Sequence, residues 1–182
     1  MKIIVTCPVK NEEWVLRCTL KNFSSFADLI IVADQSSTDA TLDICKEFEK
    51  VKVIHNPFKG YTNEVRFMLL DEARKIGGEK LIICLDADEQ IAPEFINEIK
   101  QHINSKKDSR TVSFYTDWLQ MYGSTKTYRV DGIWKNNYKT FAFFDDPSLD
   151  YDRHYVTQEH IPRVPNTNYT VQLETPIIHL QW

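Results

Sequence analysis

The chain has 182 residues, 42% of them apolar and 12% aromatic, which is enough for one domain with a substantial core. Its 22 basic and 26 acidic residues give a net charge of -4, and this balance argues against a surface that holds nucleic acid by counterion release. An anionic ligand would therefore need local help from a metal ion, a helix N-terminus or a few chosen Arg and Lys side chains.

The first residues, MKIIVTCPVKNEEW, contain one short apolar run that Pro8 and charged residues interrupt. Such a run is too short for the core of a signal peptide or for a membrane span, so we expect a cytoplasmic protein. The cysteines show neither C-x-x-C spacing nor a partnering pair of histidines, which predicts no zinc site and no disulfide framework.

Short β-rich runs alternate with segments of helical period over the first half of the chain, which predicts a parallel sheet covered by helices. We expect strands at residues 2–6, 29–34, 51–55 and 81–86, and helices at residues 12–22, 39–50, 62–76 and 93–102. Asn11 is the predicted N-cap of the first helix, and Ser37 with Thr38 caps the second.

The second half of the chain has a different character. Residues 105–110 form a polar connector, SKKDSR, and residues 111–144 are dense in aromatic and β-branched residues without helical period. We expect antiparallel or mixed strands and long loops there. The closing residues, PIIHLQW, read as a strand with no polar tail after it, as the end of a piece of a longer protein would.

A polar cluster follows each of the four expected parallel strands. These clusters are CPVKNE at residues 7–12, ADQSSTD at 33–39, HNPFKGY at 55–61 and DADE at 86–89. In an open parallel sheet, ligands bind beyond the carboxyl ends of the strands, where helix N-termini also point. The recurrence of polar clusters therefore predicts a binding site at this edge of the sheet.

Asp86 and Asp88 form a D-x-D motif that can aim two carboxylates to the same side, where a strand gives way to a turn. Carboxylate oxygens suit Mg²⁺ or Mn²⁺ held jointly with substrate phosphates. In the alternative reading, Asp86 only ends the strand, and Asp88 or Glu89 belongs to a polar turn. Asp34 also ends a strand, and a carboxylate there could accept hydrogen bonds from a base or ribose.

Three motifs in this order, PVKNE, DQSSTD and LDADE, resemble the family 2 glycosyltransferases, and among them most the bacterial lipopolysaccharide-core type. The resemblance covers residues 1 to about 105 well and the rest loosely. It implies an α/β fold of the GT-A (Rossmann-like) kind, a mostly parallel sheet flanked by helices with an aromatic-rich, mixed-strand C-terminal part. Residues 1–105 would bind the nucleotide sugar, and residues 106–182 would form the acceptor side and complete the metal site.

The implied activity is metal-dependent transfer of a sugar from a nucleotide-diphosphate sugar to an acceptor hydroxyl, with inversion at the anomeric carbon, in cell-surface glycan or lipopolysaccharide synthesis. The resemblance implies that the nucleobase of the donor lies beside Asp34 and that Pro8, Asn11 and Glu12 line the nucleoside pocket. The family pattern departs at Gln35, where a second Asp is frequent. Arg66 is a candidate contact to the diphosphate. The equal alternative is that Arg66 is an ordinary exposed residue of a helix.

The resemblance also implies how Mn²⁺ or Mg²⁺ would be bound. Asp86 would face the ribose and the metal-bound phosphates, and Asp88 would ligate the metal. His179 would ordinarily be a core or edge histidine at the end of an apolar strand. Many GT-A enzymes, however, complete the metal shell with a histidine from such a late strand, so we take His179 as the second protein ligand.

The acceptor hydroxyl needs a base, an Asp or Glu on the acceptor side with its pKa shifted toward neutrality. We favour Glu159, in a segment that resembles the H-E of the lipopolysaccharide-core type. In the alternative, Glu159 is a surface acid that pairs with Arg163. The acids of residues 144–153 read instead as a solvated loop. In the aromatic-rich middle, where most aromatic residues are more simply core or lid, Trp134 is our choice for substrate contact.

Two rival functions stay open, a sugar nucleotidyltransferase and a non-catalytic sugar-nucleotide-binding module. The first would need a Gly-rich, basic loop after the first strand, and CPVKNEEW has no glycine and two acids. The partners we expect are a nucleotide-diphosphate sugar donor and a glycan or lipid-linked acceptor. We expect no nucleic acid and no transmembrane segment, and a peripheral contact with a membrane is compatible with this sequence.

Overall fold

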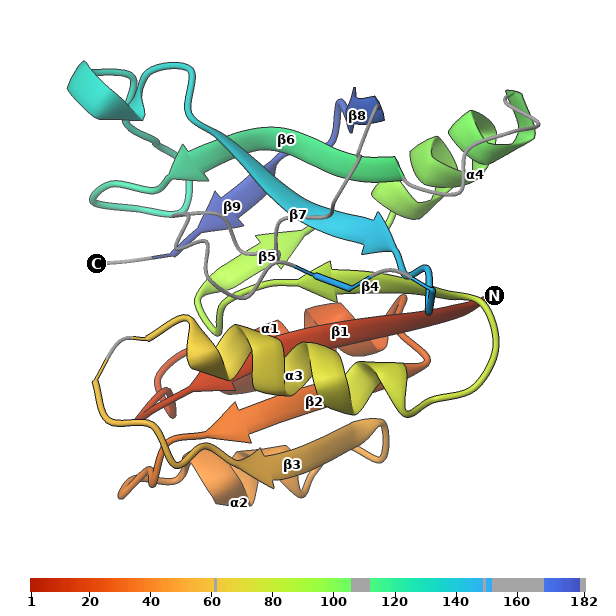
Figure 1. The fold of residues 1–182 in the computed structure, drawn as a ribbon. Helices are drawn as coiled ribbons and strands as arrows, with labels where there is room; N and C mark the ends of the chain where they lie inside the picture. Colours follow the sequence, from red (N-terminus) through yellow and green to blue (C-terminus); the bar gives the residue numbers. More distant parts are fainter. Residues whose placement is uncertain (61, 106–111, 149, 152–168, 181–182) are drawn as a thin grey trace.

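The computed structural model describes residues 1–60, 62–105, 112–148, 150–151 and 169–180, and its centre is a large mixed sheet (Figure 1). Across the sheet the strands run in the order β3-β2-β1-β4-β7-β6-β9-β5, with β8 beside β6. Their bounds are β1 (Lys2–Val9), β2 (Leu29–Asp34), β3 (Val51–His55), β4 (Lys80–Cys84), β5 (Glu89–Ile91), β6 (Val112–Gln120), β7 (Tyr138–Phe144), β8 (Tyr169–Gln172) and β9 (Ile177–His179).

Strands β1 to β4 form the parallel half of the sheet. All five residues of β4 are buried, which explains why this strand reads as a continuous apolar run instead of an alternating one. The expected strands at residues 29–34 and 51–55 are confirmed residue for residue. Strand β1 continues three residues further than expected, to Val9, and β4 ends at Cys84, so that Asp86 stands in the turn beyond it.

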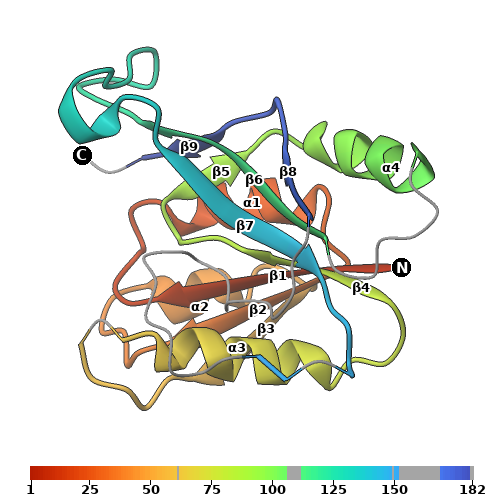
Figure 2. The same ribbon diagram turned by 45° about the horizontal axis from the view of Figure 1, so that its top comes forward.

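Helices cover both faces of this parallel half (Figures 1 and 2). The helices are α1 (Leu16–Ser24), α2 (Thr41–Cys45), α3 (Glu64–Arg74) and α4 (Phe95–Ser105). Apolar residues of α1, α2 and α4 share one core cluster with the sheet, and those of α3 belong to a second cluster on the opposite face. The molecule is thus a helix–sheet–helix sandwich, as the alternation of strands and helices predicts.

Two helix predictions are wrong in detail. Helix α1 begins at Leu16, and Asn11 is not its N-cap, because Asn11 has a positive φ of 55° and its side chain accepts a hydrogen bond from the backbone of Thr38 instead. Helix α2 spans only five residues instead of 39–50. Its first turn is stabilised by Asp39, whose carboxylate accepts a 3.0 Å hydrogen bond from the backbone N–H of Thr41, and not by Ser37 and Thr38.

The second half of the chain adds the antiparallel and mixed strands that its composition predicts. Strand β7 pairs antiparallel with both β4 and β6, while β9 lies parallel to β6 and antiparallel to β5. The pairing of β9 with β5 sets His179 opposite Glu89, and its pairing with β6 sets His179 opposite Gln120. A short 3-10 turn, η1 (Gly132–Trp134), lies in the connection between β6 and β7, which projects beyond the sheet (Figures 1 and 2). In the described ranges, no helix is long and apolar enough to cross a bilayer.

Candidate active site

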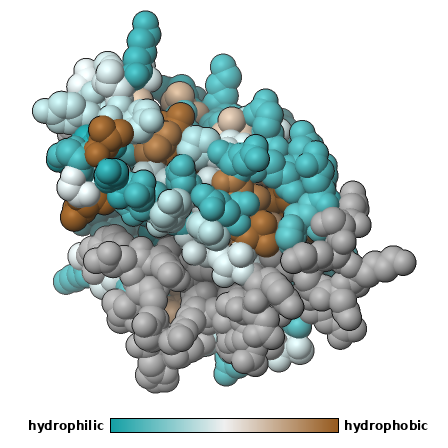
Figure 3. Space-filling view, turned by 90° about the horizontal axis from the view of Figure 1, so that it is seen from above, coloured by the Kyte–Doolittle hydropathy of each residue, from teal (hydrophilic) through white to brown (hydrophobic). Residues whose placement is uncertain are grey.

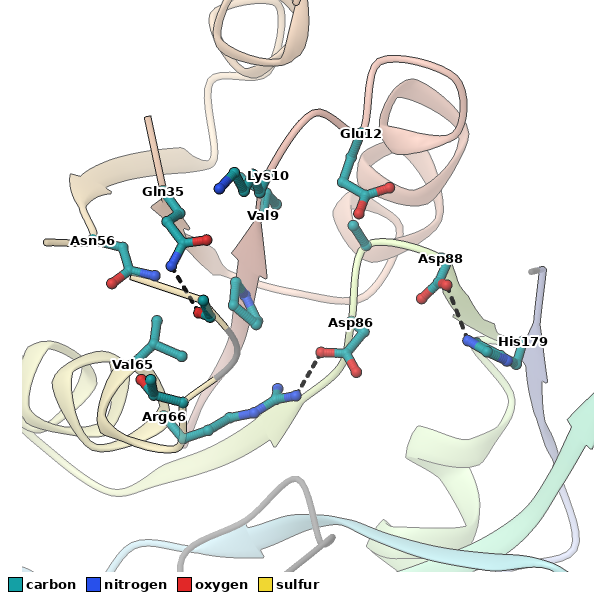
Figure 4. A pocket seen from close by; sticks show the side chains of 14 residues that line it. Val9, Lys10, Glu12, Gln35, Asn56, Val65, Arg66, Asp86, Asp88 and His179 are labelled. Atoms are coloured by element: carbon teal, nitrogen blue, oxygen red, sulfur yellow. Dashed lines mark hydrogen bonds and ion pairs between the residues drawn. The ribbon is translucent and has the colours of Figure 1, made fainter. Parts of the chain in front are cut away.

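A cavity of about 430 Å³ opens beyond the carboxyl ends of the parallel strands, where the polar clusters predict a binding site (Figure 4). Turns after β1 and β4, the start of α3 and the end of β9 all contribute to its wall. Six of the predicted site residues line it: Pro8, Glu12, Arg66, Asp86, Asp88 and His179. The fold therefore brings together side chains that are up to 171 positions apart in the sequence, from Pro8 to His179.

Asp88 and His179 face each other across the turn that follows β4. Nε2 of His179 lies 2.9 Å from Oδ2 of Asp88, and the backbone N–H of Leu180 donates a 2.8 Å hydrogen bond to the carbonyl of Asp88 (Figure 4). The side chain of His179 is 12% exposed and that of Asp88 is 22% exposed. The antiparallel pairing of β5 with β9 creates this contact, so the pairing depends on the sheet and not on any local motif.

Gln120 fixes the ring of His179. The amide nitrogen of Gln120 donates a 3.1 Å hydrogen bond to the carbonyl of Met121, so that its Oε1 faces Nδ1 of His179 at 2.6 Å. Nδ1 then carries a proton, and in the neutral imidazole Nε2 is the atom with the lone pair. Two acceptors, Nε2 and a carboxylate oxygen, thus lie 2.9 Å apart and need a positive charge between them, either a second ring proton or a metal ion.

Arg66 and Asp86 form the second ion pair of the cavity. A guanidinium nitrogen of Arg66 lies 2.6 Å from Oδ1 of Asp86 (Figure 4). The Arg66 side chain is only 9% exposed, so this residue is not the ordinary exposed helix residue that one reading of the sequence allowed. Because Arg66 sits in the first turn of α3, it adds positive charge beside the helix N-terminus, which already favours anions.

Glu12 adds a third carboxylate to the wall of the cavity. Burial, the neighbouring Asp88 and, to a lesser extent, Asp86 raise the pKa of Glu12 to about 7, despite a 3.1 Å hydrogen bond that Trp14 donates to it. The raised pKa of Glu12 thus reflects first its burial and then the negative charge of the neighbouring carboxylates. Among the described residues, no three Asp, Glu, His or Cys side chains are grouped closely enough to hold a metal by themselves.

Asn11 and Asp34 do not line the cavity but support its rim. The amide of Asn11 joins the loop after β1 to the loop after β2 through the backbone N–H of Thr38, at 2.8 Å. Asp34 is 4% exposed, and both of its carboxylate oxygens accept 3.3 Å hydrogen bonds from the backbone N–H of Ser37. Asp34 therefore has a local role, capping the turn after β2, that the sequence did not suggest.

Four polar residues that line the cavity were not among the predicted site residues: Lys10, Gln35, Asn56 and Thr62. The amide of Gln35 donates to the carbonyl oxygens of Phe58 and Gly60, the second at 2.9 Å, and so ties the loop after β3 to the end of β2. The sequence offered a signal for Gln35, its departure from the family pattern. Asn56 follows β3 in the third polar cluster, and only that position marked it.

Glu89, the last acid of the DADE cluster, is completely buried and does not lie in a polar turn. Its carboxylate accepts hydrogen bonds from the indole N–H of Trp118 at 2.6 Å, the ammonium of Lys139 at 2.8 Å and the backbone N–H of Asp86 at 3.0 Å. The ring of Trp118 packs against that of His179, with centroids 4.3 Å apart. Glu89 is thus a positioning residue behind both Asp86 and His179.

Trp134 and Glu159 belong to the acceptor side of the prediction. Trp134 stacks on Trp118, with centroids 5.5 Å apart, and does not line the cavity itself. Glu159 lies outside the described residues. The reading of residues 144–153 as a solvated loop is wrong for Asp145, whose side chain has no exposed surface and contacts Arg74, Lys80 and Tyr151.

Comparison with known proteins agrees with the fold. Residues 4–159 match the family model described as Glycosyl transferase family 2, and the chain therefore belongs to this family. The expectation drawn from the three sequence motifs is confirmed at this level. The family model also extends past the parallel half of the sheet into the second half of the chain.

Several bacterial proteins of this kind are similar in sequence. An uncharacterized glycosyltransferase of Rickettsia typhi is 29% identical over 129 residues, which cover 71% of this chain and 42% of that protein. A second, from Rickettsia bellii, is 28% identical with the same coverage. The chain thus spans less than half of the length of these relatives.

Among solved structures, S. aureus TarS 1-349 in complex with UDP-GlcNAc superimposes with a TM-score of 0.54 at 22% identity, covering 68% of this chain and 36% of that one. The same TarS fragment in complex with UDP gives the same TM-score and identity. At this level of identity the likeness concerns the fold, and it confirms the predicted GT-A type of mostly parallel α/β sheet.

Proposed function

We propose that the chain transfers a sugar from a nucleotide-diphosphate sugar to an acceptor hydroxyl, with inversion at the anomeric carbon. The observation that carries this proposal is the pairing of Asp88 with His179 in the wall of a cavity that the Arg66–Asp86 ion pair also lines. Membership of the family and the nucleotide complexes of TarS, a protein of similar fold, support a nucleotide-sugar donor.

The cavity offers complementary groups for the two ends of such a donor. Thr62, Val65 and Arg66, at the start of α3, line one side, where a diphosphate would meet the helix N-terminus and a guanidinium. Pro8, Gln35 and Asn56 line the part nearer to β1 and β2, with an apolar ring and two amides suited to a nucleoside. We also propose that the protein is of the bacterial lipopolysaccharide-core subtype, which rests on the sequence motifs alone.

The donor set fits a divalent cation, Mn²⁺ or Mg²⁺. Asp88 and His179 present two acceptor atoms 2.9 Å apart, and a metal bound by them could take its remaining ligands from the donor diphosphate. When bound, the ion supplies Lewis-acid stabilisation of the departing diphosphate. Asp86, held by Arg66, stands next to this pair and is placed to orient the ribose and phosphates.

Inversion requires a single displacement, in which the acceptor oxygen attacks the anomeric carbon as the bond to the diphosphate breaks. A base then takes the proton of the acceptor hydroxyl, and Glu159 remains our prediction for this role. For the acceptor we propose a glycan or lipid-linked sugar, with Trp134 as a contact, in cell-surface glycan or lipopolysaccharide synthesis. We propose a cytoplasmic location for the site.

The test of this function is turnover of sugar nucleotides. UDP-, GDP-, CDP- and dTDP-sugars are screened with and without Mn²⁺ by thermal shift, and the nucleotides that raise the melting temperature are then assayed for release of the diphosphate. Asp88→Asn should lower turnover roughly 100-fold, since it removes a metal ligand. The matched control is Asp43→Asn on α2, whose side chain is 78% exposed.

Three results would contradict the proposal, two of them transfer itself and the third the role of Asp88. Donor binding without release of a nucleoside diphosphate under any condition would indicate a non-catalytic binding module. Formation of a nucleoside triphosphate from pyrophosphate and a sugar nucleotide would indicate a nucleotidyltransferase. Equal turnover in Asp88→Asn and Asp43→Asn would remove Asp88 from the chemistry.

A further inference from the structure

Exposed apolar side chains gather in the connection between β6 and β7, which we take together with Tyr138, the first residue of β7, as residues 121–138. Of the nine large apolar side chains that are exposed in the described part of the chain, five lie in this connection: Tyr122, Tyr128, Val130, Ile133 and Tyr138. Ile133 is 81% exposed and Tyr122 is 69% exposed. Figure 3 views the molecule from the side on which the connection projects. At the left of this view, apolar groups lie on the surface among polar ones.

The backbone of the connection is built to present these side chains. Gly132, the first residue of η1, and Asn136, two residues after its end, have positive φ values of 53° and 57°, and this tight turn carries Ile133 at its centre. At the root, Met121 and Tyr128 form an isolated bridge, and the backbone N–H of Tyr122 donates a 3.0 Å hydrogen bond to the carbonyl of Thr127. An ordered loop that exposes apolar groups in this way is typical of an interaction site.

The charge of the connection is opposite to that of the rest of the chain. Lys126, Arg129 and Lys135 outnumber Asp131, so residues 121–138 carry +2, whereas the whole chain carries -4 and the remaining residues therefore -6. Arg129 forms a bidentate ion pair with Asp131, at 3.0 and 2.8 Å. The excess positive charge thus resides on Lys126 and Lys135, both of which are exposed.

From these observations we infer that the β6–β7 connection docks on an anionic phospholipid bilayer. Lysines among tyrosines and aliphatic side chains are the combination by which a peripheral protein binds such a surface, the lysines at the headgroups and the apolar groups below them. Tyrosine is suited to the boundary, because its ring is apolar and its hydroxyl stays in water. The projecting shape favours insertion into a bilayer over a flat contact with another protein.

Docking of this connection would orient the candidate active site toward the membrane. The backbone N–H of Arg129 donates a 2.9 Å hydrogen bond to the carbonyl of Gln120, whose side chain holds His179 at 2.6 Å. Trp134 stacks on Trp118, which packs against the same histidine. The connection and the Asp88–His179 pair are therefore parts of one packed unit. The consequence for the reaction, which rests on the proposed function, is that the acceptor substrate lies at the membrane surface.

The test is sedimentation of the 182-residue chain with vesicles, without any nucleotide. The wild type should pellet with vesicles of equal phosphatidylglycerol and phosphatidylcholine, and not with pure phosphatidylcholine. Lys126→Gln and Lys135→Gln should each lower the partition coefficient about fivefold, the factor expected for one basic residue near an anionic surface. Ile133→Asp should abolish pelleting.

The matched controls change similar residues elsewhere on the surface. They are Val53→Asp on β3, where the wild-type valine is 41% exposed, and Lys100→Gln on α4. Both should pellet as the wild type does. The inference is overturned if the wild type does not pellet with anionic vesicles, or if the connection variants and controls pellet equally. A wild-type dimer in size-exclusion chromatography that Ile133→Asp dissociates, without vesicle binding, would also overturn it and assign the surface to a second copy. Because no sugar nucleotide is present, failure here leaves donor turnover unaffected.

Discussion

At the scale of single residues, the site is defined by carboxylates whose charges the protein itself only partly balances. Arg66 balances Asp86, and His179 can balance Asp88 only when its ring is doubly protonated or when a cation stands between them. Burial and the neighbouring Asp88 raise the pKa of Glu12 to about 7. A carboxyl group that resists ionisation in the wall of a cavity is a common feature of sites that bind cations or transfer protons.

The titration of Glu12 makes stability depend on pH. Its pKa is about 7 in the folded chain against 4.5 for the free side chain, so between these values the folded state binds more protons than the unfolded state. Stability contributed by Glu12 is therefore lost as the pH rises from about 4.5 to 7. After allowance for its partial exposure, Glu12→Gln should gain about 1 kcal/mol of unfolding free energy at pH 8 and nothing at pH 4.5.

Urea unfolding at the two pH values measures this difference, with Glu94→Gln, a change of an exposed acid ahead of α4, as the control. The same gain at both pH values would show that Glu12 does not titrate in this window. A gain in the control as well would assign the effect to net charge and not to the cavity.

At the scale of elements, the buried carboxylate of Glu89 joins three strands. Glu89 lies on β5, Trp118 on β6 and Lys139 on β7, and their hydrogen bonds tie the strands together behind the turn that carries Asp86. Lys139 also lies over the ring of Trp118, with its ammonium 4.4 Å from the centroid. The Asp88–His179 pair is thus supported by a charge cluster whose members do not line the cavity.

Glu89→Gln should destabilise the fold by about 3 kcal/mol, because it leaves the largely buried ammonium of Lys139 beside a neutral amide. Glu89→Gln combined with Lys139→Met should recover part of that loss, since both charges are then removed. Chemical denaturation of the four proteins of this double-mutant cycle gives the coupling. If the losses simply add, the two side chains do not interact, and the role of Glu89 as a positioning residue fails.

At the scale of the whole molecule, the sequence predicts best what local patterns decide. Residues 29–34 and 51–55 were predicted correctly because each is a continuous β-rich run with polar residues on both sides. The start of α1 was misplaced because Asn11 serves the loop after β2, a contact between residues 27 positions apart. The burial of Glu89 could not be predicted either, because its partners Trp118 and Lys139 are 29 and 50 positions away.

The candidate site shows the same division between local and distant contacts. Asp86 and Asp88 stand where a D-x-D motif after a strand predicts them. Their partners come from elsewhere, Arg66 from α3 and His179 from the register of β5 with β9. Only the resemblance to a family singled out His179, because nothing near it in the sequence marks a histidine that pairs with an acid 91 positions earlier.

The central claim is that Asp88 and His179 together hold a divalent cation that the donor diphosphate shares. Anomalous diffraction from crystals soaked with MnCl₂ and UDP tests it most directly. The account predicts a manganese peak in contact with both Oδ2 of Asp88 and Nε2 of His179, with UDP in the cavity beside Arg66. UDP bound in the cavity with no manganese peak there, and with the direct Asp88–His179 contact intact, would contradict it.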